Sequence, residues 1–354
     1  MFERILMMGV SPVTLDDLTS GYDIALNISA NTKFNRMLGF GEDDVRQMIE
    51  YYRGQGKISI PTDELVAKMK PWYDNYCFAK DSYGKEPSVF NCDMVTYFLH
   101  NLIDTGMPPE QMIDPNTRTD YTKMKRLIRL DHLDGNRKGI IHKIAEEGYI
   151  YAPLIPNFPS SDLIKPKMFQ SLLFYYGMFT ITGVEGAMLR LCIPNNNVRK
   201  QYYDYLLEEY QQIQPVDTTD LDMAYYDAAV DGNWQPAMRF IADAYTATTS
   251  VRQLIEGERN IQGFFLAYLN LYPYYLTLPD TVRYPMVAHA YIIELKYLLE
   301  KDGDGKAEWQ WNEATAQLHA YAASDRVKAL VGNATLHLVA MQFKGLCLHR
   351  MGEV

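Results

Sequence analysis

Apolar residues recur at helical spacing through most of the chain. Residues 43–52 and 63–69 each begin with an acidic residue that can cap a helix and continue with apolar residues three or four positions apart. The same spacing predicts further helices at residues 95–103, 169–176, 198–212, 234–246, 250–271 and 311–323. The chain is therefore predicted to be an α+β protein that is mostly helical.

Four short segments have the pattern of strands. Residues 5–10 form an apolar run that ends at a proline, and residues 188–193 alternate between apolar and other side chains. Residues 290–295 are dominated by β-branched and aromatic side chains, and residues 335–343 form a last expected strand. The order of a helix at 169–176 followed by a strand pair is compatible with a winged-helix unit.

The segment Tyr291–Lys296 carries only two charged residues, and they are two positions apart. Alternate side chains of a strand share a face, so Glu294 and Lys296 are expected to lie together, with Ile293 and Leu295 pointing the other way. A carboxylate and an ammonium on the buried face of a strand are costly unless they have partners or a task. A strand end that reaches solvent is the alternative, because a Glu-x-Lys pattern is too short to identify a site by itself.

Composition and charge limit the classes of function. The chain has 354 residues, of which 47% are hydrophobic and 22% charged, as expected for a globular protein of more than one domain. Its formal charge of −10 argues against a protein that coats nucleic acid nonspecifically, although a local basic groove is still open. No apolar run reaches membrane-spanning length, so we expect a cytoplasmic protein without membrane contact. The four cysteines are scattered and are expected to be reduced thiols rather than zinc or redox pairs.

Two tempting motifs fail on their spacing. Gly54–Lys57 lacks the spacer and the following Ser or Thr of a phosphate-binding loop, so no nucleotide is expected as a ligand. Asp302, Asp304 and Glu313 fall near ligand positions of a calcium loop, but Lys306 and Ala307 stand where an oxygen ligand and the turn glycine belong. Both segments are interpreted as solvated turns.

The longer motifs resemble a bacterial family that joins an AAA-ATPase-like domain to a C-terminal PD-(D/E)XK nuclease-like domain. The resemblance extends over nearly the whole chain. In the first part it rests on residues 8–21, 27–29, 37–40 and 72–76. In the last part it rests on residues 258–265, 278–280, 291–296 and 317–321.

This resemblance implies metal-assisted cleavage of phosphodiester bonds in DNA, with Mg²⁺ or Mn²⁺ as cofactor. Glu294 would be a metal ligand, and Lys296 would orient the attacking water or stabilise the charge on the phosphate. Glu258 matches the family's outer acidic position, and Gln317 and Tyr321 match a Gln-x-x-x-Tyr element that lines the site. An ordinary amphipathic helix is the alternative for Gln317 and Tyr321.

The resemblance also predicts three regions. Residues 1–139 would be the C-terminal part of an AAA-ATPase-like domain, a helical remnant without the phosphate-binding loop, so ATP hydrolysis is not expected. Residues 140–216 would be a winged-helix-like unit or a helical connector, and the acidic balance favours the connector. Residues 217–354 would form an α/β domain of the restriction-endonuclease-like type.

One element of the family is not visible in this sequence. The strand that carries the catalytic aspartate should lie between the segments matching residues 271–275 and 278–280, and here these segments nearly touch. Asp280 is the only carboxylate between Leu271 and Ile293, which makes it the one local substitute as a metal ligand. A catalytically inactive member that acts as a binding or assembly module is therefore the alternative to a nuclease.

Overall fold

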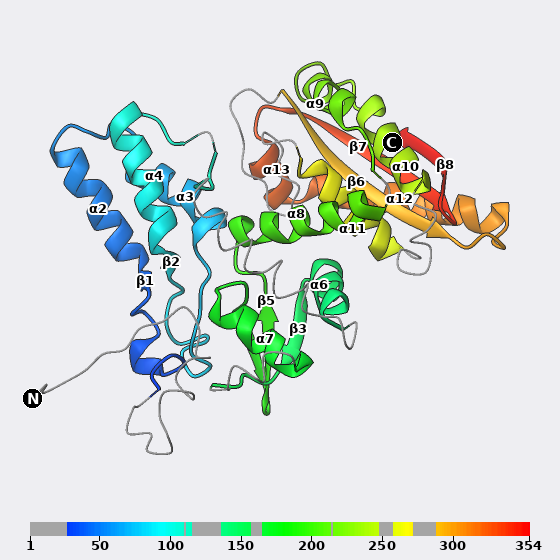
Figure 1. Ribbon diagram of the computed structural model, residues 1–354. Coiled ribbons are helices and arrows are strands. Elements are labelled where there is room, and N and C mark those ends of the chain that lie inside the picture. The colour runs from blue at the N-terminus through cyan, green and yellow to red at the C-terminus, as the bar shows by residue number, and fades with distance from the viewer. Residues whose placement is uncertain are drawn as a thin grey trace, which may run out of the picture. The chain divides into compact units, whose positions relative to one another are not determined.

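The computed structural model describes residues 27–109, 111–114, 136–156, 165–213, 215–247, 258–271 and 288–354. The chain divides into two compact units, Met1–Tyr202 and Tyr203–Val354 (Figure 1). The predicted α+β class is confirmed, with about half rather than most of the protein helical. The expected strand at residues 5–10 lies outside the described residues. The predicted boundaries at 139/140 and 216/217 stay predictions.

The first part of unit 1 is a small helical assembly joined by a two-stranded sheet. Asp44 accepts a hydrogen bond from the Gly41 N–H at 2.8 Å and so caps the start of the first long helix, whose first turn is acidic. At the third long helix the arrangement is reversed: the cap residue Asn91 itself accepts a hydrogen bond from the Met94 N–H at 3.1 Å. In chain order the elements are η2 (Thr32–Phe34), β1 (Gly39–Phe40), α2 (Glu42–Gly54), α3 (Thr62–Tyr73), β2 (Phe90–Asn91) and α4 (Cys92–Thr105).

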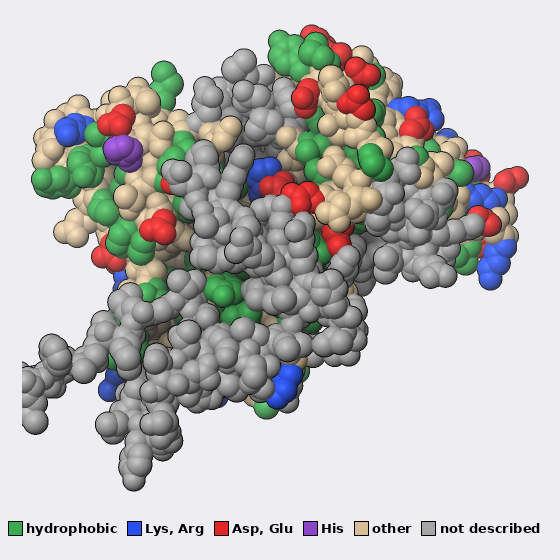
Figure 2. All heavy atoms as spheres, in the orientation of Figure 1, with side chains coloured by type: hydrophobic (Ala, Val, Ile, Leu, Met, Phe, Trp, Pro, Cys, Tyr) green, Lys and Arg blue, Asp and Glu red, His purple; other side chains and the backbone are tan. Residues whose placement is uncertain are grey.

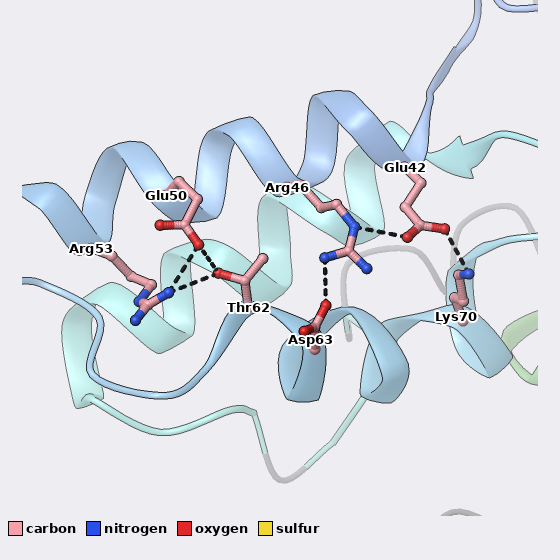
Figure 3. A network of polar contacts seen from close by, with 7 residues as sticks. All are labelled: Glu42, Arg46, Glu50, Arg53, Thr62, Asp63 and Lys70. Atoms are coloured by element: carbon pink, nitrogen blue, oxygen red, sulfur yellow. Dashed lines mark hydrogen bonds and ion pairs between the residues drawn. The ribbon is translucent and has the colours of Figure 1, made fainter.

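Helices α2 and α3 are joined by two clusters of polar contacts on their surface (Figure 3). Glu42 pairs with Arg46 at 2.8 Å and with Lys70 at 2.6 Å, and Arg46 also reaches Asp63 at 2.6 Å. The second cluster joins Glu50, Arg53 and Thr62. Together the two clusters hold three acidic and three basic side chains, so the network is balanced in charge.

The aromatic segment at the end of α3 belongs to the core of unit 1. Trp72, Tyr73 and Tyr76 are buried, and the Tyr73 hydroxyl donates to the Met112 carbonyl at 2.6 Å. Asn75 has a φ of 77°, a left-handed conformation that asparagine tolerates better than most residues. Packing therefore accounts for the unusual number of aromatic residues in this segment.

The second part of unit 1 has the predicted helix followed by a hairpin. Its elements are α6 (Asn136–Glu147), β3 (Tyr149–Ala152), α7 (Pro166–Tyr175), β4 (Thr180–Glu185) and β5 (Met188–Cys192). The strands form an antiparallel sheet in the order β3-β5-β4. Helix α7 buries Met168, Phe169 and three consecutive residues, 172–174. These buried side chains pack α7 into the core of this part of the chain, and the choice between a winged-helix-like unit and a connector stays a prediction.

Unit 2 begins inside a helix and ends in a mixed sheet. Helix α8 (Asn196–Ile213) contains the boundary between the units. The later elements are α9 (Thr219–Val230), α10 (Gln235–Ala247), α11 (Glu258–Leu269), β6 (His289–Leu298), α12 (Asp304–Ala323), α13 (Asp325–Val331), β7 (Thr335–Lys344) and β8 (Cys347–Glu353). The strand order is β6-β7-β8, with β6 parallel to β7 and β8 antiparallel to it.

Helices cover both faces of this sheet (Figure 1). Helix α12 connects the parallel strands and packs Trp311, Ala314 and Leu318 against Ala340 of β7. Phe343, which points to the opposite face, meets two aromatic rings edge to face, Tyr245 of α10 and Phe265 of α11. The face of the sheet that α12 covers therefore also carries Glu294, Lys296 and the other even-numbered side chains of β6.

Strand β8 is missing from the sequence prediction, which ended the sheet with residues 335–343. Its segment, Cys-Leu-His-Arg-Met-Gly-Glu, has no β-branched residue and includes a glycine. Pairing with β7 fixes it as a strand, so tertiary contact overrides local propensity here. No helix in the described parts of the chain is both long and apolar enough to cross a membrane.

Candidate active site

Strand β6 brings Glu294 and Lys296 to one face of the sheet, as the alternation predicts. The Lys296 ammonium lies 3.1 Å from Glu294 Oε1, and only 8% of the lysine side chain is exposed. A buried ammonium needs acceptors in place of water, so its remaining N–H groups must find partners in the protein. The interpretation of this pair as two charges at a solvent-facing strand end is therefore wrong for Lys296.

Helix α12 supplies those partners. Lys296 Nζ donates to Gln317 Oε1 at 2.9 Å and lies 3.8 Å from Glu313 Oε2. Gln317 Nε2 in turn donates to Glu313 Oε1 at 3.5 Å. The network therefore joins a strand to the helix that follows it.

Two further hydrogen bonds fix α12 against the sheet. Gln310 Nε2 donates to the Tyr297 carbonyl of β6 at 3.1 Å, and the buried Gln342 of β7 donates to the Ala307 carbonyl at 2.9 Å. These contacts set the position of the helix along the strands. As a result Gln317, about three and a half turns from the start of the helix, reaches Lys296.

Glu258 is the first residue of α11 and belongs to the same electrostatic environment. Although the residue is exposed, partial desolvation by the neighbouring protein raises the pKa of its carboxyl group, and the charges of Glu294 and Glu313 raise it further. The Lys296 charge and a backbone hydrogen bond from Tyr297 act in the opposite direction. The predicted outer acidic position therefore lies within electrostatic reach of the pair on β6.

Lys296 remains the cation of this group. Burial lowers the pKa of its ammonium, but the hydrogen bond to Glu294 and the negative charges of Glu294, Glu258 and Glu313 outweigh that effect, and the pKa is raised overall. A lysine with a raised pKa holds its proton at neutral pH. It can act as a positive charge or a hydrogen-bond donor rather than as a base.

The remaining predicted residues are less closely associated with this network. Tyr321 lies one turn beyond Gln317 on α12 and is 49% exposed. No hydrogen bond links its hydroxyl to another side chain among the described residues. Asp280 and the segment Tyr275–Pro279, where a catalytic aspartate strand was sought, lie outside the described residues.

Sequence reasoning missed Glu313 as part of this network and considered it only for the failed calcium loop. The signal available was its position one helical turn before Gln317, which puts both side chains on one side of a helix. The same spacing occurs on any amphipathic helix, so contact with Lys296 is what distinguishes it.

Carboxylate oxygens are suitable ligands for Mg²⁺ or Mn²⁺, and Glu258, Glu294 and Glu313 all influence one ammonium. Within the described ranges, however, no three His, Cys, Asp or Glu side chains are gathered closely enough to hold a metal ion. The donor chemistry of these carboxylates fits a divalent metal, but the described residues alone do not form a metal site.

The family comparison agrees with this geometry. Residues 256–352 match the PD-(D/E)XK nuclease superfamily, so the C-terminal part of the chain is a domain of that superfamily. The match begins just before α11, ends within β8 and includes the whole Lys296 network. No curated protein and no solved structure matches the chain. The AAA-ATPase-like assignment of the first part stays a prediction.

Proposed function

We propose that residues 256–352 act as a divalent-metal-dependent nuclease that hydrolyses phosphodiester bonds of DNA. The observation that carries this proposal is the position of the Lys296 ammonium, which is held between Glu294 of β6 and Gln317 of α12. This strand and helix belong to the segment that matches the nuclease superfamily.

In this proposal each residue has a limited task. Glu294 would hold the divalent ion, which when bound supplies Lewis acidity and an activated water. Lys296 would stabilise negative charge on the phosphate, because a buried ammonium acts as a compact point charge in a poorly solvated site. Gln317 would keep that ammonium at its place on the strand.

The charge balance of the site supports a role for a divalent cation in the proposed approach of DNA. Glu258, Glu294 and Glu313 outnumber Lys296, so the described part of the site is negative at neutral pH. Figure 2 shows no gathered basic patch on the visible face: the described Lys and Arg side chains are scattered among acidic ones. A divalent metal bound beside Glu294 would offset this repulsion.

The experiment is cleavage of linear and supercoiled DNA by the full chain with Mg²⁺ or Mn²⁺, with EDTA as the metal-free control. Glu294→Gln and Lys296→Met should each lower the rate by about 10²–10³-fold, as for loss of one electrostatic contact to a transition state. Glu308→Gln is the matched control, because Glu308 lies on α12 but pairs with Arg350 on the surface. Cleavage that survives both Glu294→Gln and Lys296→Met would refute the assignment.

A second candidate function is a catalytically inactive binding or assembly module of the same superfamily. The observation that favours it is the lack, in the described parts of the chain, of three grouped ligands for a metal. Isothermal titration calorimetry with Mg²⁺ and Mn²⁺ separates the two. Heat of binding that disappears in Glu294→Gln supports the nuclease, and no binding in an intact fold supports the module.

A further inference from the structure

Gln317 lies between two groups of opposite hydrogen-bonding character. The Lys296 ammonium can only donate, and the ionised Glu313 carboxylate can only accept. A carboxamide has one accepting and one donating end, and here the oxygen faces Lys296 at 2.9 Å while the nitrogen faces Glu313 at 3.5 Å. The reverse orientation would put donor against donor and acceptor against acceptor, so chemistry alone fixes which way the amide points.

Glu313 also contacts the ammonium from a second side. Its Oε2 atom lies 3.8 Å from Lys296 Nζ, so one carboxylate faces both the lysine and the glutamine that binds it. Together the three side chains form a closed triangle across β6 and α12. Without Glu313 the Gln317 nitrogen loses its acceptor, while Lys296 keeps its contacts with Glu294 and with the Gln317 oxygen.

We propose that Glu313 is a positioning residue of the candidate site. It holds the Gln317 carboxamide with its oxygen toward Lys296 and thereby centres the ammonium where a phosphate would meet it. This inference rests on the proposed nuclease function for its catalytic consequence. Its structural consequence, the fixed orientation of the Gln317 amide, does not depend on that function.

The ordinary alternative is a solvent-exposed Glu–Gln pair one turn apart on a helix, worth about 0.2–0.5 kcal/mol. Such a pair would stabilise α12 slightly and leave the lysine unaffected. Direct metal binding by Glu313 is another alternative. The three roles of Glu313 predict different effects when this residue is replaced by a neutral one.

The experiment compares Glu313→Ala with Glu313→Gln in the full chain. Glutamine can still accept from Gln317 Nε2, so a positioning role predicts that Glu313→Gln keeps kcat within about threefold of wild type. Alanine cannot accept, and Glu313→Ala should lower kcat about 10–100-fold with little change in KM, because small displacements of a catalytic group are costly. Equal loss of kcat in the two variants would overturn the proposal.

The second readout is independent of catalysis. In ¹⁵N-labelled protein, assigned by comparison with Gln317→Glu, the Gln317 side-chain amide signals should shift and sharpen in Glu313→Ala but stay near their wild-type positions in Glu313→Gln. Glu308→Gln should leave them unchanged. If wild type cleaves no DNA, the nuclease proposal fails while this measurement still decides the positioning of Gln317; signals that do not respond to Glu313→Ala overturn it.

Discussion

Two networks of charged side chains in this protein differ in balance and in burial. The network between α2 and α3 pairs three acidic with three basic residues on the surface. The network of β6 and α12 holds one ammonium, mostly buried, within reach of three carboxylates. The first network has equal numbers of acidic and basic side chains and joins two helices. The second has three carboxylates around one ammonium, an excess of negative charge that the proposed metal ion would offset.

The largest expected effect comes from removal of the buried cation. Lys296→Met leaves Glu294 and Gln317 Oε1 without their donor, and breaking a buried charged pair typically lowers the free energy of unfolding by about 3 kcal/mol or more. Urea denaturation in EDTA measures this loss in the free energy of unfolding. The control is Lys306→Met, which removes a half-exposed partner of Asp302 and should cost less than about 1 kcal/mol. Equal losses in the two variants would mean that Lys296 is no more integrated than a surface lysine.

A smaller effect, with opposite signs in the two networks, is expected from pH. Lys70 and Arg46 lower the pKa of Glu42 below its ordinary 4.5, so its stabilising contribution is complete above pH 4.5 and is lost as the pH falls through its folded pKa. Partial desolvation raises the pKa of Glu258 above 4.5, so its ionisation destabilises the fold as the pH rises through the folded pKa.

The test measures the free energy of unfolding of wild type, Glu42→Gln and Glu258→Gln in EDTA between about pH 3 and pH 7. The value for each variant is subtracted from that of wild type, which gives a first difference for Glu42 and a second for Glu258. The first difference should increase with pH and the second should decrease. Two differences of the same sign would remove the contrast between the networks.

The smallest effect belongs to a single surface ion pair. Lys70→Ala removes the 2.6 Å contact between the Lys70 ammonium and Glu42. The Lys70 side chain is 46% exposed. Exposed pairs contribute about 0.2–1 kcal/mol, and salt screens them. We therefore expect a loss within that range at low salt that largely disappears at about 1 M NaCl, measured by thermal unfolding. A loss that persists in salt would indicate packing by the lysine stem instead of charge.

Local patterns predicted much of the fold. The helices at 43–52, 63–69, 95–103 and 198–212 correspond to α2, α3, α4 and α8, because an apolar stripe at helical spacing has few other ways to be buried. The strand at 290–295 is the central part of β6 for a similar reason. Strand β8 was not predictable, since its residues are poor strand formers that pair only because β7 presents an edge.

The candidate site was predictable to the extent that it follows from one element at a time. Alternation along β6 placed Glu294 and Lys296 on one face, and the resemblance to the nuclease family indicated Gln317. Glu313 required knowledge of how α12 crosses the sheet, which depends on packing and on the Gln310 and Gln342 hydrogen bonds. Contacts between elements are a property of the assembled domain that periodicity does not encode.

The direct connection of β6 to α12 has an evolutionary consequence. Glu294, Lys296, Glu313 and Gln317 all lie in one continuous strand–helix segment, so a single stretch of sequence carries all four. A rearrangement of the gene before residue 288 would leave these four residues in place in the sequence, although α10 and α11, which pack against Phe343, precede that point. In the proposed nuclease, turnover would depend in addition on a further carboxylate supplied from outside this segment.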